Sequence, residues 1–255
     1  MAKCCAAHGL DRRGLLAAIG VGVPATLAAM SLGVPRATAA TGSGAAPKSP
    51  AEALAALKEG NARYTTSPQL CVAKLTEQRA NLVAGQAPWA TVIACADSRV
   101  PPELIFGGLG PGELFVARNA GNLVDTSAIG TVEFGAAVLG SPLIVVLGHS
   151  RCGAVDAACK VVTDNATYPG SIGPMIDPIV PAALAVRDKP GDFLANTIRE
   201  SALRTARRLP GASTILHDLE EAGKLKIVAA EYELETGKVA FFEEVAQGSA
   251  TQSKG

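Results

Sequence analysis

The feature that most restricts the fold is a set of three apolar runs, each of which ends in polar residues. They are "ATVIACA" ending near Ala96, "ELFVARN" ending near Asn119 and "PLIVVLG" ending at Gly148. Continuous apolar runs of this length, rich in valine and isoleucine, are typical of strands buried on both faces of a parallel sheet. The segments between them are long enough for crossovers, so the sequence predicts an α/β fold.

Helix signals fill most of the remaining chain. Caps, breakers and apolar spacing predict helices over residues 49–60, 74–84, 126–139, 153–162, 171–187, 192–209 and 213–222. The segment "KLKIVAAEYELETGKVAFFEE" predicts two strands joined at Thr236 and Gly237. The expected fold is a single α/β domain with a central, mostly parallel β-sheet flanked by helices and a C-terminal β-hairpin.

The composition indicates a globular chain without a nucleic-acid partner. Of the 255 residues, 48% are hydrophobic and 18% are charged, which suits one compact domain. The 23 basic and 23 acidic residues balance, and no basic stripe with interleaved aromatic residues is present.

Residues 1–40 differ in kind from the rest and predict an export signal. Arg12 and Arg13 precede an uncharged segment that extends to Pro35, and "RATAA" follows with the spacing of an A-x-A cleavage site. The arginine pair resembles a twin-arginine signal. We expect export to the periplasm or beyond the cell, with no stable membrane association after cleavage. A plain secretory signal or an uncleaved anchor is the alternative.

The expected signal determines where the folded domain should begin and how many cysteines the mature chain keeps. A linker is expected over residues 41–49, the main α/β domain over 50–246 and a flexible tail over 247–255. The mature chain keeps four cysteines, too few for a disulfide scaffold. Cys71 and Cys159 either pair with each other or remain free buried thiols.

Three residues from the polar clusters form a candidate metal site. Ligands of parallel sheets gather at the carboxyl ends of the strands. Cys95 ends the first run, His149 follows the third, and Cys152 stands where the next helix begins. Each alone has an ordinary structural explanation, but two thiolates and one imidazole together favour zinc, with a fourth position left for water or Asp97.

The motifs "CADSRVPPE", "GELFVARNAGNLV" and "GHSRCGAV" resemble the β-class carbonic anhydrases, and the similarity covers roughly residues 51–242. The resemblance implies reversible hydration of carbon dioxide to bicarbonate and a proton, with one Zn²⁺ per chain. It makes Cys95, His149 and Cys152 the zinc ligands and Asp97 and Arg99 a catalytic dyad.

The resemblance also implies a substrate pocket. Gln86 and the backbone N–H of Gly153 become hydrogen-bond donors to the substrate, and Phe115 and Ala120 become parts of its apolar wall. In the family this pocket is completed across a dimer interface, so a homodimer or a higher even oligomer is expected.

The resemblance distinguishes two states of the site. In the open state Arg99 pairs with Asp97, and in the closed state Asp97 takes the fourth zinc position. Relatives that close under bicarbonate control typically carry tryptophan three residues before the first cysteine ligand, where this chain has Val92. We therefore expect the open form.

Two other functions remain as alternatives. The same site in the same fold would suit a hydrolase of a carbon dioxide analogue such as carbon disulfide. A non-catalytic zinc or thiol-redox protein, with Cys95 and Cys152 cycling to a disulfide, leaves the dyad unexplained. His217, on a predicted helix, is expected to be a surface residue, with a proton-shuttle role as the alternative.

Overall fold

The structure is a computed structural model that describes residues 47, 49–68, 82–83 and 85–242. The predicted signal, the tail and Cys71 lie outside the described residues. So do most of the predicted linker and most of the helix expected over 74–84.

The core is one five-stranded sheet with the order β2-β1-β3-β4-β5. Its strands are β1 (Ala90–Cys95), β2 (Leu114–Asn119), β3 (Leu143–His149), β4 (Lys226–Tyr232) and β5 (Val239–Phe242). The first four are parallel, and β5 pairs antiparallel with β4 to form the C-terminal hairpin. The predicted mostly parallel sheet is confirmed.

Helices connect the strands and cover the sheet. The α-helices are α1 (Pro50–Thr66), α3 (Pro102–Ile105), α4 (Thr126–Glu133), α5 (Gly153–Asp164), α6 (Ile172–Ile176), α7 (Val180–Val186), α8 (Phe193–Ala212) and α9 (Thr214–Glu221). A π-helix, η2 (Phe134–Val138), extends α4, and a 3₁₀ turn, η3 (Asp177–Ile179), joins α6 to α7. Within the described part of the chain, none of these helices has the length and apolarity needed to cross a membrane.

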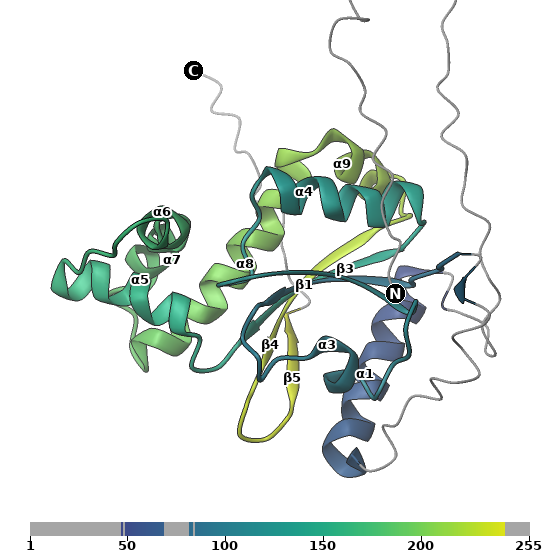
Figure 1. Cartoon of the computed structure of the whole chain (residues 1–255), viewed down its shortest axis with the longest axis horizontal. Helices are drawn as coiled ribbons and strands as arrows, with labels where there is room; N and C mark the ends of the chain where they lie inside the picture. The colour runs from purple at the N-terminus through teal and green to yellow at the C-terminus, as the bar shows by residue number, and fades with distance from the viewer. Residues whose placement is uncertain (1–46, 48, 69–81, 84, 243–255) are drawn as a thin grey trace, which may run out of the picture. The chain divides into compact units, whose positions relative to one another are not determined.

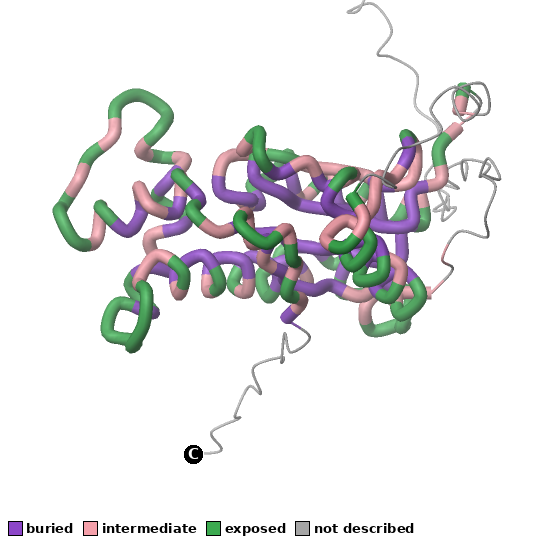
Figure 2. Tube along the Cα trace, turned by 90° about the horizontal axis from the view of Figure 1, so that it is seen from below, coloured by how far each residue is buried: buried purple, intermediate pink, exposed green. Residues whose placement is uncertain are grey.

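The two faces of the sheet belong to different apolar clusters. Alternate strand residues such as Val92, Val145 and Val228 pack with α1 and α3, and their neighbours such as Ile93 and Val146 pack with α4, α8 and α9. Figure 1 shows α1 and α3 on one side of the strands and α4 and α9 on the other. Every residue of β1 and β3 is buried. Figure 2 shows buried trace through the middle of the domain and exposed trace mainly in its outer loops. Burial on both faces explains why β1 and β3 are uniformly apolar.

The first helix does not end at Gly60, as its sequence predicts, but continues to Thr66. Ser49 starts it with a capping box: its hydroxyl accepts from the Glu52 N–H, and the Glu52 carboxylate accepts from the Ser49 N–H. Gly60 is there because α1 crosses α3 at this point. A Cβ at Gly60 would lie 2.0 Å from the Phe106 carbonyl oxygen.

The single helix expected over residues 171–187 is wrong. The segment is divided into α6, η3 and α7, with Pro178 in η3 and Pro181 in the first turn of α7. Proline lacks the N–H that a continuous helix requires and is accepted in a first turn. The other predicted helices beyond β2 are present, with ends shifted by up to three residues.

Candidate metal centre

Three side chains meet at the carboxyl edge of the sheet. Cys95 ends β1, His149 ends β3, and Cys152 precedes α5 as its N-cap residue. Their exposed fractions are 5%, 0% and 1%. Their ligand atoms all lie within 4.8 Å of one another. The topology therefore brings together the three residues that the sequence singled out.

The tautomer of His149 follows from its hydrogen bonds. Its Nδ1 lies 2.9 Å from the carbonyl oxygen of Ser150, which can only accept, so Nδ1 carries the proton. In the neutral ring Nε2 then has the free lone pair. It is buried and has no hydrogen-bond partner among the described residues. An orphaned acceptor aimed at two thiols is the arrangement that a metal ion would satisfy.

The two cysteines form a polarised pair and not a disulfide. Their sulfurs are 4.0 Å apart, twice a disulfide bond length, and both thiols are free. The hydrogen bond from Cys152 lowers the pKa of Cys95 to about 4, against the effect of burial and with help from His149 and the Gly121 N–H. The bond to Cys95, together with burial, raises the pKa of Cys152. Cys95 therefore ionises more readily than Cys152.

This donor set fits zinc. Thiolate sulfur and neutral imidazole are the preferred zinc ligands, and three protein ligands with one open position are typical of a catalytic site. A bound cation would deprotonate Cys152 as well, because a coordinating thiol loses its proton. The backbone N–H groups of Ala154 and Val155, at the start of α5, oppose the rise in the pKa of Cys152 and so favour its charged form.

Asp97 and Arg99 form an ion pair beside the ligands. Arg99 Nε lies 2.9 Å from Oδ1 and Nη2 lies 2.7 Å from Oδ2 of Asp97. The side-chain hydrogen bonds from Arg99 hold the pKa of Asp97 well below its usual range. Oδ2 is 3.9 Å from His149 Nε2, so the carboxylate faces the ligand cluster without joining it.

A second arginine, Arg118, binds the loop that follows β1, and it was not predicted from the sequence. Arg118 Nε donates to the carbonyl oxygen of Cys95 at 2.9 Å, and its Nη2 donates to that of Asp97 at 2.6 Å. The Gly121 N–H approaches the Cys95 sulfur at 3.4 Å. The sequence feature that could have singled out Arg118 is its position as a basic residue near the end of an otherwise apolar run, directly before Asn119.

The predicted substrate-pocket residues are not all brought to the ligands. Gly153 begins α5 beside Cys152 and leaves open space where a Cβ would lie. Gln86 lies before the amino end of β1, whose six residues span about 17–20 Å. Phe115 sits early in β2 and stacks on the half-exposed Phe134, with ring centroids 6.1 Å apart. One chain therefore places Gln86 and Phe115 away from its own ligands.

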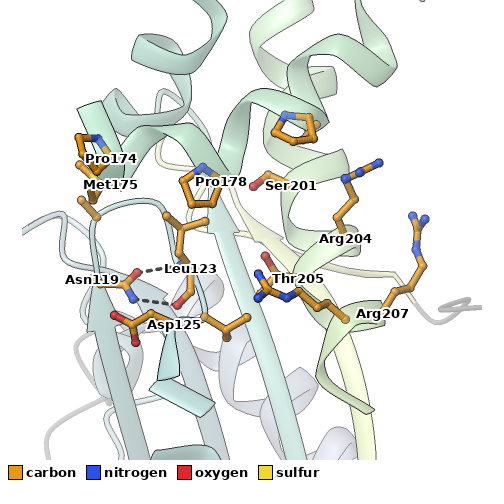
Figure 3. Close-up of a pocket in the computed structure, with 15 residues that line it drawn as sticks. Asn119, Leu123, Asp125, Pro174, Met175, Pro178, Ser201, Arg204, Thr205 and Arg207 are labelled. Atoms are coloured by element: carbon orange, nitrogen blue, oxygen red, sulfur yellow. Dashed lines mark hydrogen bonds between the residues drawn. The ribbon is translucent and has the colours of Figure 1, made fainter. Parts of the chain in front are cut away.

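Ala120 lines a groove of about 740 Å³ next to the site (Figure 3). Prolines of the α6–α7 segment form one wall of the groove and arginines of α8 the other. The Asn119 side chain closes the turn by bonding both the N–H and the carbonyl of Leu123 at 2.7 Å. The three candidate ligands do not line this groove.

Two further residues have structural placements. Cys159 is a free buried thiol 3.4 Å from the Thr197 hydroxyl; because Cys71 lies outside the described residues, their pairing stays a prediction. His217 is exposed on α9, which leads into the amino end of β4. This end is opposite the ligand edge, so the surface interpretation is favoured over a proton shuttle.

Comparison with known proteins agrees with this geometry. The family model described as "Carbonic anhydrase" matches residues 90–239. Carbonic anhydrase 2 of Mycobacterium tuberculosis is 36% identical over 194 residues, 74% of this chain and 91% of that protein.

Two solved structures are similar in fold and sequence. The β-carbonic anhydrase CafA of Aspergillus fumigatus has a TM-score of 0.57 and 26% identity, over 77% of this chain and 91% of that one. One of two tetrameric β-carbonic anhydrases from Sordaria macrospora has the same score and identity, over 74% and 95%. The chain belongs to the β-class carbonic anhydrases, which are carbonate dehydratases.

Proposed function

We propose that this protein holds one zinc ion through Cys95, His149 and Cys152 and uses it to hydrate carbon dioxide reversibly. The observation that carries the proposal is the buried, partnerless Nε2 of His149, which points at two thiol sulfurs. Bound there, zinc acts as a Lewis acid that lowers the pKa of a coordinated water from about 15.7 to near 7.

Asp97 and Arg99 serve as the catalytic dyad. The two hydrogen bonds from Arg99 keep the Asp97 carboxylate ionised and turned toward the guanidinium. The carboxylate is then an acceptor that orients a proton-bearing group at the ligand cluster. This pairing supports the open form of the site, in which Asp97 is not a ligand.

The substrate pocket is completed by a second copy of the chain. Gly153 and Ala120 lie on the same edge as the ligands, but Gln86 and Phe115 do not. We infer that the partner subunit supplies the Gln86 donor and the Phe115 wall. The tetrameric assembly of the Sordaria macrospora relative supports an even oligomer.

The test is stopped-flow hydration of carbon dioxide by protein of known zinc content. Cys95→Ser should lose both zinc and activity, whereas Asp97→Ala should keep zinc and lose activity. Stoichiometric zinc with no acceleration between pH 7 and 9 would refute the proposal and favour the zinc or thiol-redox alternative. Carbon disulfide tested as a substrate of the same protein distinguishes carbon dioxide hydration from the hydrolase alternative. Hydrolysis of carbon disulfide without hydration of carbon dioxide would favour the hydrolase.

We also propose that the protein is exported after it has folded around its metal. Two thiols that enter an oxidising compartment unfolded risk forming a disulfide before metal binds. Twin-arginine export carries folded cargo. Fractionation of cells that express the full chain tests the location. Replacement of residues 1–40 by a signal for unfolded export should lower zinc occupancy, and equal occupancy would refute loading before export.

A further inference from the structure

We infer that Glu233, in the turn of the β4–β5 hairpin, is a positioning residue for the metal ligand His149 and acts through Ser150. The inference rests on the proposed zinc site. It involves a carboxylate 83 residues from Ser150 in sequence and outside the three motifs that carry the metal chemistry.

The first link is between His149 and Ser150. The ring of His149 is fully buried, and the Ser150 carbonyl oxygen, 2.9 Å away, is the hydrogen-bond acceptor of its Nδ1–H. The position of the Ser150 peptide therefore determines both the tautomer of the ring and the direction of Nε2.

The second link is between Ser150 and the hairpin. The Ser150 N–H donates to the Tyr232 carbonyl at 2.9 Å. Its hydroxyl donates to Glu233 Oε1 at 2.8 Å and accepts from the Leu234 N–H at 3.0 Å. Three hydrogen bonds with consecutive residues of the hairpin thus hold Ser150, whose carbonyl oxygen fixes the His149 ring.

Glu233 is itself fixed in place. Its N–H donates to the Lys238 carbonyl at 2.8 Å, and its carbonyl accepts from the Gly237 N–H at 2.9 Å. Its Oε1 also accepts from the Glu235 N–H at 3.1 Å. The hydrogen bonds that its carboxylate accepts, first from the Ser150 hydroxyl and then from the Glu235 N–H, lower the pKa of Glu233, and an ionised acceptor strengthens the contact with the hydroxyl.

The hairpin is tied in turn to the body of the domain. Asn61 of α1 donates to the Gly237 carbonyl at 2.9 Å and accepts from the Val239 N–H at 2.9 Å. The chain of contacts from α1 through the hairpin to His149 is therefore continuous, and Glu233 is the link that can be changed without touching the ligands.

The experiment measures the zinc dissociation constant of the full-length chain by competition with a chelator. Glu233→Ala and Ser150→Ala should each weaken zinc binding by about 10–100-fold, the range typical of residues that orient a metal ligand. Glu233→Gln keeps an acceptor oxygen and should stay within about threefold of wild type. Glu235→Ala, which removes a carboxylate from the same turn, is the matched control and should have no effect.

A second readout separates orientation from loss of structure. The visible spectrum of the cobalt-substituted protein should shift in Glu233→Ala and not in Glu235→Ala, at a temperature at which both metal-free variants are folded by circular dichroism. Wild-type zinc affinity in Glu233→Ala and Ser150→Ala would overturn the inference, as would an equal loss in Glu233→Ala and Glu233→Gln. Failure of the wild-type chain to bind zinc would instead overturn the proposed function.

Discussion

Arg99 holds both carboxylate oxygens of Asp97, with its Nε 2.9 Å from Oδ1 and its Nη2 2.7 Å from Oδ2. A planar guanidinium that binds two oxygens fixes the orientation of a carboxylate, which a single contact does not. The same guanidinium reaches toward the Arg151 carbonyl at 3.5 Å. It therefore connects the loop after β1 with the loop that carries Cys152.

Removal of this arginine should affect catalysis more than metal binding. In Arg99→Met, Asp97 loses the partner that fixes its orientation and keeps it out of the ligand set, and kcat/KM should fall by about 100-fold, the lower end of typical acid–base contributions. Zinc content, measured by atomic absorption, should stay at one per chain. Arg187→Met, at an exposed position away from the site, is the control. Unchanged kcat/KM in Arg99→Met would contradict the dyad.

A methyl group at Gly60 should destabilise the domain. Alanine favours helix over glycine, but its Cβ would lie 2.0 Å from the Phe106 carbonyl oxygen, so α1 and α3 must separate. We expect Gly60→Ala to lower the free energy of unfolding in urea by about 1–3 kcal/mol. Gly130→Ala, in α4 with open space around it, should instead gain up to about 1 kcal/mol. A Gly60→Ala variant more stable than wild type would show that α1 and α3 leave room for a methyl group.

Asn61 should contribute more to stability than an ordinary surface amide. Its buried side chain serves the Ile105 and Gly237 carbonyls and the Val239 N–H. Asn61→Ala removes all three contacts, and each buried group left unsatisfied costs about 1–3 kcal/mol. Urea unfolding should therefore show a loss of at least about 2 kcal/mol. Asn196→Ala, which removes one exposed bond to Pro190, should cost far less; equal losses would refute the assignment.

Glu231 should make stability fall as the pH rises. Burial raises its pKa above the ordinary 4.5, so the folded state favours the protonated form. Below pH 4.5 both states are protonated and there is no penalty. Above it the unfolded chain ionises first, and folding loses stability until the raised pKa is passed.

The variant Glu231→Gln tests this sign. Compared in the metal-free state, it should be more stable than wild type at pH 8, and the advantage should vanish near pH 4. Thermal unfolding at several pH values measures the difference. A variant less stable than wild type at pH 8 would show that the ionised carboxylate is favourably paired.

The cysteine pair should be sensitive to oxidation only without metal. The sulfurs of Cys95 and Cys152 are 4.0 Å apart, so a shift of about 2 Å would allow a disulfide. Diamide treatment of the metal-free protein should remove two titratable thiols, and Cys152→Ser should abolish that loss. Zinc-loaded protein should keep them. Loss of the same thiols with zinc bound would contradict their role as ligands.

The parallel sheet and the three residues of the candidate metal site could be predicted from the sequence. Apolar runs of this length predict buried strands, and Cys95 and His149 stand at the ends of two such runs. Because carboxyl ends of parallel strands share one edge, their meeting follows from topology alone. The helix start at Ser49 is equally local, since its capping box lies within four residues.

Other features were decided only by tertiary structure. Nothing near Gly60 shows that α1 continues past it, because the reason is the Phe106 backbone packed against it. The separation of Gln86 from the ligands depends on the length of β1 between them. The bond between Ser150 and Glu233 joins segments 83 residues apart. Local patterns predict strands and ligands, whereas contacts between distant segments depend on how whole elements pack.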